Sequence, residues 1–401
     1  MDIPRHLLAV LQQRATRYPV VTVTGPRQSG KTTLARAAFP AHAYVNLEDP
    51  EQRSYARTDP REFLSRFTRR VIIDEAQRVP DLFSYVQVMV DADDEPGRFI
   101  LTGSHNFLLM RSIKQSLAGR AAVLHLLPLA RRELAGLPPL SLDALADGRL
   151  EPGAGLPPDQ DLLDALLTGG YPRIHARDLD PRVWLADYFR TYVDRDVLEV
   201  LDVRDQEAFG RFVRLCAGRS GQILNLSALA ADAGITHPTA RSWLSVLEAS
   251  FLIMLLLPHH RNFNKRLVKS PKLYFTDTGL LCYLLRIRSA AELATHGARG
   301  AVFESYVVAE FAKNFRNRGV DPDMWFWRDS RGREVDLIVE AEASTVPVEI
   351  KSGRTVAGDF FASLHYWRQL AGEDARPGVL IYGGDDMRVQ QGHVVVPWWA
   401  I

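Results

Sequence analysis

Residues 20–33 read Val-Val-Thr-Val-Thr-Gly-Pro-Arg-Gln-Ser-Gly-Lys-Thr-Thr. The first five are all β-branched and predict a buried strand, whereas the residues after 31 favour a helix. The glycines at 25 and 30 let the backbone between them approach a ligand closely. A strand, a Gly-x-x-x-x-Gly-Lys-Thr loop and a helix in this order predict a P-loop in an α/β fold with a parallel sheet.

This loop predicts a binding site for ATP and Mg²⁺. Backbone N–H groups at the start of the helix, where its dipole is positive, hold phosphate oxygens. Lys31 is expected to bridge the β- and γ-phosphates, and the Thr32 hydroxyl to hold Mg²⁺. The other predicted nucleotide-binding residues lie in the same loop: Gly25, Pro26, Arg27, Gln28, Ser29, Gly30 and Thr33. The alternative is a chance match on a glycine-rich turn, which the flanking strand and helix disfavour.

Two adjacent acids follow a second apolar run. Residues 71–75 read Val-Ile-Ile-Asp-Glu, which is typical of a Walker B strand. Asp74 is expected to bind Mg²⁺, and Glu75 to polarise the attacking water. Ordinary surface charge is the alternative, but the apolar run favours a central strand, and ligands collect at the carboxyl ends of such strands.

Further strands are predicted at 43–47 and 99–102. The second of these leads into Gly-Ser-His-Asn at 103–106, whose polar side chains are well placed to contact the γ-phosphate. Ser104 or Asn106 is the expected sensor of that phosphate.

Several motifs together resemble a family of bacterial and archaeal AAA-like ATPases in which the ATPase core precedes a domain of unknown function. In the N-terminal third they are the P-loop, Val-Ile-Ile-Asp-Glu-Ala-Gln-Arg-Val-Pro at 71–80, Leu-Thr-Gly-Ser at 101–104 and Leu-Ala-Gly-Arg at 117–120. Downstream they are Gly-Gly-Tyr-Pro at 169–172, Tyr-Val-Asp-Arg-Asp at 192–196 and Tyr-Phe-Thr-Asp-Thr-Gly-Leu at 274–280. The resemblance covers nearly the whole chain.

The resemblance implies two further features. AAA-like ATPases have an additional strand between the P-loop and Walker B strands, which we assign to residues 44–50. Arg120 is expected to act in trans as an arginine finger, and this role requires a homo-oligomer. On residue type alone, Arg120 would be a surface residue.

The length and composition predict several soluble domains. A chain of 401 residues exceeds the roughly 250–300 residues that one core supports. Stretches rich in Pro and Gly predict a linker at 136–160, after an ATPase domain at 1–135. The next domains are expected at 161–290, helical with a winged helix, and at 291–401, a nuclease-like α/β domain.

The charge and hydropathy exclude some classes of protein. No apolar run approaches the roughly 18 residues of a membrane span, so no membrane partner is expected. The N-terminus shows no signal peptide, which predicts a cytoplasmic location. The net charge is +1, so any binding of DNA requires a local basic patch.

The middle of the chain has the spacing of a helix-turn-helix. Residues 226–236 and 237–248 carry a shared apolar face. Ser227 and Thr236 are predicted to cap the two helices, and Gly234 to allow the turn between them.

A wing is predicted from the strands at 251–257 and 272–276. The segment 259–272 between them is basic, and no Asp or Glu occurs from 249 to 276. Uncompensated positive charge suits a phosphate backbone, so DNA is the expected partner. Packing against the ATPase domain is the alternative use of this module.

The last domain contains an acidic constellation similar to that of PD-(D/E)XK nucleases. Glu304 falls on the apolar stripe of a predicted helix, Asp336 lies on a strand, and Glu349 ends another strand. In this reading Glu304, Asp336 and Glu349 bind Mg²⁺, and Lys351 orients the attacking water. A nuclease-like fold kept for DNA binding or as a scaffold is the alternative.

These features combine into one functional hypothesis and one rival. The hypothesis is an AAA-like ATPase that acts on DNA, with Mg²⁺-dependent nuclease activity in its last domain. The rival is a nucleotide-gated regulatory or interaction module with an inactive nuclease-like domain. DNA-stimulated ATP hydrolysis and DNA cleavage would distinguish them.

Overall fold

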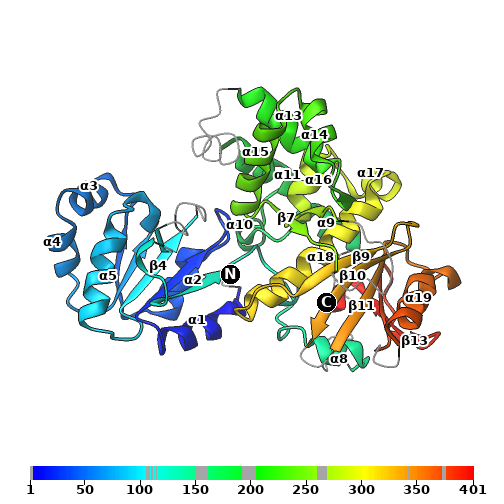
Figure 1. The fold of residues 1–401 in the computed structure, drawn as a ribbon, viewed down its shortest axis with the longest axis horizontal. Coiled ribbons are helices and arrows are strands. Elements are labelled where there is room, and N and C mark those ends of the chain that lie inside the picture. The colour runs from blue at the N-terminus through cyan, green and yellow to red at the C-terminus, as the bar shows by residue number, and fades with distance from the viewer. Residues whose placement is uncertain are drawn as a thin grey trace.

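The structure is a computed structural model. It describes residues 3–104, 109, 112–113, 115–149, 161–191, 205–259, 269–341, 344–372 and 376–401. The chain forms an N-terminal α/β part, a helical part and a C-terminal part built on a mixed sheet, as Figure 1 shows in blue to cyan, green to yellow and orange to red.

A five-stranded parallel sheet forms the N-terminal part, in the order β2-β3-β4-β1-β5. Its strands are β1 (Val20–Thr24), β2 (Ala43–Asn46), β3 (Val71–Asp74), β4 (Phe99–Gly103) and β5 (Ala121–His125). Every residue of β1, β3 and β4 is buried, as expected for a parallel sheet covered on both faces. The predicted α/β fold class is therefore confirmed.

The position of one strand differs from the prediction. The strand between the P-loop strand β1 and the Walker B strand β3 is β4, whereas β2, in the segment assigned to this place, lies at the edge of the sheet. Strand order depends on crossover connections, which local sequence does not reveal. The strand β5 beside β1 was not predicted.

Helices cover both faces of this sheet. They are α1 (Leu7–Ala15), α2 (Lys31–Ala38), α3 (Pro50–Thr58), α4 (Pro60–Ser65) and α5 (Leu82–Ala92), with a 3₁₀ turn η1 (Ala76–Arg78) after β3. Because side chains alternate along a strand, Val21 and Val23 pack with α1 and α2, while Val20 joins the core on the α5 side.

The segment after the sheet contains α7 (Arg131–Leu134) and α8 (Leu142–Ala146). The predicted linker at 136–160 contains the short helix α8, in which Ser141 accepts a hydrogen bond from the Ala144 N–H and Leu145 is buried. Residues 150–160 lie outside the described part of the chain.

Among its described residues, the helical part combines eight helices with a small antiparallel sheet of order β6-β8-β7. The helices are α9 (Leu162–Thr168), α10 (Pro172–Arg177), α11 (Pro181–Tyr188), α13 (Gln206–Ala217), α14 (Leu226–Ala233), α15 (His237–Ala249), α16 (Thr278–Leu284) and α17 (Ala290–Thr295). The strands are β6 (Gln222–Ile223), β7 (Ile253–Leu256) and β8 (Lys272–Phe275).

The predicted helix pair is formed by α14 and α15, and the two predicted strands by β7 and β8. Gly234, at φ 72°, ends α14, and the Thr236 side chain caps α15. The predicted cap at Ser227 is wrong, because α14 begins at Leu226, two residues before the start that a cap at Ser227 requires. Asn225 caps it by accepting a hydrogen bond from the Ala228 N–H at 3.0 Å.

The C-terminal part is a six-stranded mixed sheet in the order β13-β14-β12-β11-β10-β9. Its strands are β9 (Met324–Arg328), β10 (Glu334–Ala341), β11 (Ser344–Lys351), β12 (Val379–Tyr382), β13 (Arg388–Gln390) and β14 (His393–Pro397). Its helices are α18 (Arg299–Asn317) and α19 (Ala362–Ala371), with 3₁₀ turns η3 (Gly358–Phe361) and η5 (Trp398–Ala400).

One continuous hydrophobic core joins the helical part to the C-terminal sheet, and α18 runs through it. The helix carries the apolar stripe predicted for it, since Val307, Val308, Phe311 and Phe315 are all buried. In Figure 1 α18 passes between the N-terminal part and the C-terminal sheet. No helix of the described residues is both long and apolar enough to span a membrane.

Candidate functional site

The P-loop connects β1 to α2 and needs glycine at two positions. A Cβ atom on Gly25 would lie 2.1 Å from the carbonyl oxygen of Leu126, which no side chain can tolerate. Gly30, at φ 92°, has the left-handed conformation from which α2 starts. The two glycines therefore allow the backbone to turn sharply, so that the N-terminus of α2 faces the loop.

Lys31 is buried inside this loop. Its Nζ donates hydrogen bonds to the carbonyl oxygens of Gly25, at 3.0 Å, and Pro26, at 2.8 Å. Burial lowers the pKa of Lys31 to about 8, although the nearby carboxylates of Glu75 and Asp74 act to raise it. The ammonium group is thus held by neutral carbonyls, which phosphate oxygens could replace.

Asp74 ends β3 beside the start of α2. Its Oδ2 accepts hydrogen bonds from the hydroxyls of Thr32, at 2.8 Å, and Tyr44, at 2.9 Å. Its other oxygen accepts one from Thr102. The two residues predicted to hold Mg²⁺, Thr32 and Asp74, are therefore in direct contact. Oxygen donors of this kind fit that ion.

Glu75 follows in the left-handed conformation, at φ 54°. Its carboxylate accepts hydrogen bonds from the Ser104 hydroxyl, at 2.7 Å, and from the Gln77 side chain. Burial acts to raise the pKa of Glu75, but the Lys31 ammonium and these two hydrogen bonds outweigh it and lower that pKa. The residue is consequently a carboxylate at neutral pH.

These side chains surround a cavity of about 770 Å³. The predicted residues that line it are Arg27, Gln28, Ser29, Gly30, Lys31, Thr32, Thr33, Asp74, Glu75 and Ser104. The fold also brings Arg5 from before α1 and Arg173 from α10 to the cavity wall. A volume of this size suits a nucleotide.

Sequence reasoning missed Tyr44 and Gln77. Their side chains donate hydrogen bonds to Asp74 and Glu75, respectively. Tyr44 lies in a predicted strand and Gln77 in the stretch 71–80, so both were within recognised segments. Asn106, the other candidate sensor, lies outside the described residues. Arg120 does not line the cavity, and its guanidinium pairs with Asp91 on α5.

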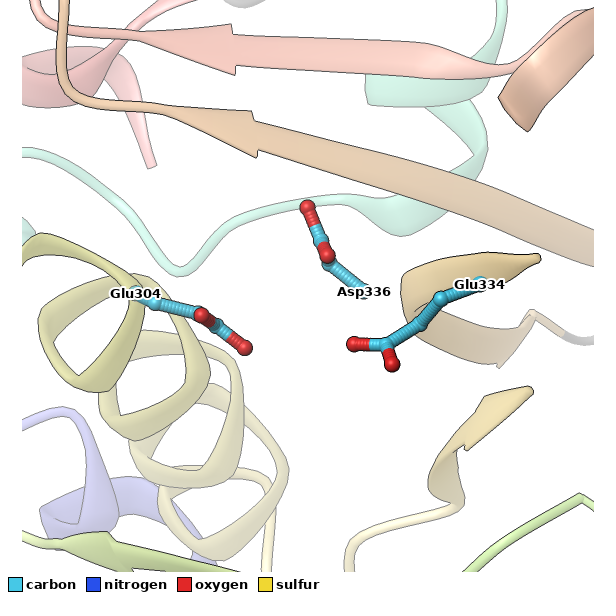
Figure 2. A group of neighbouring side chains, drawn as sticks. All are labelled: Glu304, Glu334 and Asp336. Atoms are coloured by element: carbon cyan, nitrogen blue, oxygen red, sulfur yellow. The ribbon is translucent and has the colours of Figure 1, made fainter. Parts of the chain in front are cut away.

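Carboxylates also converge in the C-terminal part. Oxygens of Glu304, Glu334 and Asp336 lie within 4.8 Å of one another. Figure 2 shows Glu304 and Glu334 extending toward one another from α18 and β10, with Asp336 between them. Glu334 was not predicted as a member of this cluster, although it lies two residues before Asp336 and so shares its face of β10.

Glu349, the third predicted ligand, is not a member of this cluster. Its carboxylate pairs with Lys351, whose Nζ lies 3.8 Å from an oxygen of Asp336. Asp336 also accepts a hydrogen bond from the Ile350 N–H at 2.9 Å. Burial, followed by the charges of Glu349 and Glu304, holds the pKa of Asp336 well above its usual value.

A lysine of the helical part contacts the cluster. The Nζ of Lys272, at the start of β8, lies 2.9 Å from Oε1 of Glu304 and also pairs with Glu334. The Tyr274 hydroxyl donates a hydrogen bond to the same Glu304 oxygen at 2.6 Å. The expectation that Lys272 is uncompensated positive charge is therefore wrong.

The other end of the predicted basic segment is also buried, since His259 is 3% exposed. Lys269 is exposed, and residues 260–268 lie outside the described part of the chain. His259 and Lys272, the two ends of the segment that was predicted to contact DNA, are therefore buried.

The parallel sheet, the P-loop and the acids Asp74 and Glu75 define a P-loop ATPase of the AAA-like class. A family model for an AAA domain matches residues 17–135. Two models for domains of unknown function, DUF8612 and DUF4143, match residues 159–291 and 299–401. The chain belongs to the family of AAA-like ATPases with a C-terminal domain of unknown function, as the resemblance predicted.

Relatives in this family include uncharacterised proteins of Mycobacterium tuberculosis and Mycobacterium bovis. Each is 33% identical over 355 residues, which are 88% of this chain and 74% of the relative. Solved structures with similarity include a Walker-type ATPase of Pyrococcus abyssi, at 17% identity and TM-score 0.42, over 70% of this chain and 94% of that one. Another is the Holliday junction branch migration motor of Thermotoga maritima, at 19% identity and TM-score 0.29. The match covers 62% of this chain and 85% of the motor protein.

Proposed function

We propose that the chain binds ATP with Mg²⁺ at the P-loop and hydrolyses it. The observation that carries this proposal is the meeting of Lys31, Thr32, Asp74 and Glu75 around one cavity. These residues match the parts that P-loop ATPases use to hold phosphates and metal and to orient water.

Each residue has a distinct task in this proposal. Lys31 exchanges the carbonyls of Gly25 and Pro26 for phosphate oxygens, which gives its charge a stronger partner. Thr32 and Asp74 would hold Mg²⁺, which neutralises charge on the β- and γ-phosphates when bound. Glu75, kept ionised by its surroundings, accepts a hydrogen bond from the attacking water and orients it.

The experiment measures ATP binding by calorimetry and phosphate release in the presence of Mg²⁺. The intact chain should bind and turn over ATP, and Lys31→Ala should lose both. The exposed Lys269 supplies the control, because Lys269→Ala removes the same charge away from the cavity. Equal ATP binding by the Lys31→Ala variant and the unaltered chain would refute the proposal.

A second proposed activity concerns the carboxylate cluster. We propose that Glu304, Glu334 and Asp336, with Lys351 beside Asp336, form a Mg²⁺-dependent site that cleaves DNA. Support comes from the convergence of three acids and a lysine, which α18 and the neighbouring strands β10 and β11 supply. The helix pair α14–α15 and the strands β7 and β8 are proposed to be a winged helix that contacts the DNA.

Cleavage of single- and double-stranded DNA with Mg²⁺ tests this second activity. Asp336→Ala and Lys351→Ala should each abolish cleavage, and cleavage that persists unchanged in both variants would show that the site is wrongly assigned. ATP turnover should rise with DNA at low salt and lose this stimulation at high salt. A chain with no stimulation at low salt would instead be a nucleotide-gated interaction module.

A further inference from the structure

Arg5, just before α1, joins three distant parts of the chain. Its Nη1 donates to the Ser29 carbonyl of the P-loop at 2.8 Å, and its Nη2 donates to the Leu127 carbonyl at 2.7 Å. Its Nε donates to Oε1 of Glu133 at 3.0 Å. The Arg5 side chain is only 8% exposed. A buried guanidinium with three acceptors has little freedom to move.

Glu133 fixes the position of Arg5. This carboxylate is fully buried, and it also accepts hydrogen bonds from the backbone N–H groups of His6, at 2.8 Å, and Ala130, at 2.9 Å. A buried ion pair is well held only when the remaining lone pairs are satisfied in this way. Arg5 is therefore anchored at its Nε and reaches the P-loop with its terminal nitrogens.

The contact with Ser29 controls the direction of a P-loop amide. The Ser29 carbonyl and the Gly30 N–H belong to one peptide unit, in which the two groups point in opposite directions because the bond is planar and trans. When Arg5 holds the Ser29 oxygen on one side, the Gly30 N–H points to the other. That N–H is one of the donors that a P-loop offers to phosphate.

We propose that Arg5 is a positioning residue for the nucleotide site, because it orients the Gly30 N–H for phosphate and ties the P-loop to the segment 127–130. The proposal rests on the ATP binding proposed above. Arg5 touches no reacting atom in this role and acts through the peptide unit that it holds.

The same contacts link the P-loop to the rest of the chain. Leu129 donates its N–H to the Gly170 carbonyl at 2.7 Å, and its own carbonyl accepts a hydrogen bond from Lys313 on α18 at 3.0 Å. The segment of Leu127 and Leu129 thus lies between the guanidinium of Arg5 and two parts of the chain outside the parallel sheet, the connection from α9 to α10 and the helix α18. Because the same hydrogen bonds hold residues 3–8, residues 127–130 and the P-loop, nucleotide bound at the loop should make all three segments open less often.

The test compares Arg5→Met and Arg5→Lys with the unaltered chain. We expect Arg5→Met to weaken ATP affinity and raise KM about tenfold, since a charge-assisted hydrogen bond of the loop is lost. A smaller change in kcat should accompany it. Arg5→Lys should recover part of the affinity, because an ammonium keeps the charge but lacks the planar fork. Arg70→Met, which removes an arginine that pairs with Glu95 at the surface, is the matched control.

A purely structural role would predict a different result. It would lower the melting temperature and leave the KM of the folded protein unchanged, so KM within twofold of the unaltered value in both folded variants overturns the proposal. If Lys31→Ala loses ATP binding and Arg5→Met keeps it, the role proposed for Arg5 is wrong, while ATP binding at the P-loop still holds. A chain that binds no ATP overturns the proposed function as well.

If neither variant folds, hydrogen exchange of the unaltered chain tests whether Arg5 is a positioning residue. Saturating ATP and Mg²⁺ should slow amide exchange at residues 5–8 and 127–130 as well as in the P-loop. Protection confined to the P-loop and α2 would overturn the proposal.

Discussion

Lys272 Nζ lies 2.9 Å from Glu304 Oε1, so that an ammonium group of the helical part neutralises a carboxylate that α18 contributes to the C-terminal cluster. Lys272 pairs with Glu334 at the same time. An ammonium so placed competes with any divalent cation for these oxygens, because both neutralise the same charges.

The first prediction concerns Lys272→Met. Loss of the ammonium leaves acids together without compensation, and we expect the free energy of unfolding in EDTA to fall by about 3 kcal/mol. Mg²⁺ or Mn²⁺ should restore more stability to this variant than to the unaltered chain. Urea unfolding with and without metal measures both effects. Lys269→Met is the control, and equal unfolding midpoints for the two variants would contradict the prediction.

The second prediction concerns the pH dependence of ATP binding. Burial lowers the pKa of Lys31 from 10.5 to about 8, so the nucleotide-free chain loses this charge as the pH rises through that value. ATP affinity should fall over the same range, and Lys31→Arg, which stays charged, should show no such fall. Calorimetric titration at a series of pH values measures this. Parallel pH profiles in the two proteins would refute the assignment.

The same pKa affects stability. Between about 8 and 10.5 the unfolded chain binds the proton of Lys31 more tightly than the folded chain. Stability contributed through this residue therefore increases as the pH rises across this window.

The third prediction concerns Glu75→Gln. The amide keeps the shape of the side chain but cannot accept a proton, and its single oxygen can accept only one of the hydrogen bonds that Ser104 and Gln77 donate. ATP should still bind while turnover falls by roughly 10²-fold or more. Phosphate release and calorimetry on the same preparation separate the two effects. Glu62→Gln, at an exposed position on α4, should behave like the unaltered chain. Turnover by Glu75→Gln within a few-fold of normal would argue for another base.

The fourth prediction tests Arg120 as a finger supplied by a second copy of the chain. Arg120→Ala should lower turnover, and a mixture of Arg120→Ala with Glu75→Gln should regain activity, since each copy supplies what the other lacks. The pairing of Arg120 with Asp91 in one chain must then open on assembly. A monomer with full activity, or a mixture that regains none, would rule out this role.

Local sequence predicted the elements around the candidate nucleotide site, because each of them is a contiguous segment of the chain. Strand, loop and helix follow one another around Lys31, and the apolar run before Asp74 marks a strand that is buried on both faces. The order of the strands was not readable, since the pairing of β4 with both β1 and β3 joins segments far apart in the chain.

The acidic cluster shows a feature that local sequence could not predict. Asp336 and Glu304 were predicted from their own helix and strand, but Lys272 was assigned to DNA because no acid is near it in sequence. The fold brings Glu304 and Glu334 to it from other elements. Charge compensation is a property of neighbours in space, and a count along the chain cannot show it.

The helix α18 connects the two regions that carry chemistry. Near its C-terminal end Lys313 donates a hydrogen bond to the Leu129 carbonyl. Nine residues earlier, Glu304 belongs to the acidic cluster. This separation is about 13 Å along the axis of a helix. A helix transmits axial displacement with little bending over such a distance. α18 therefore joins the carbonyl of Leu129, beside the nucleotide site, to the carboxylate of Glu304 in the acidic cluster through one continuous element.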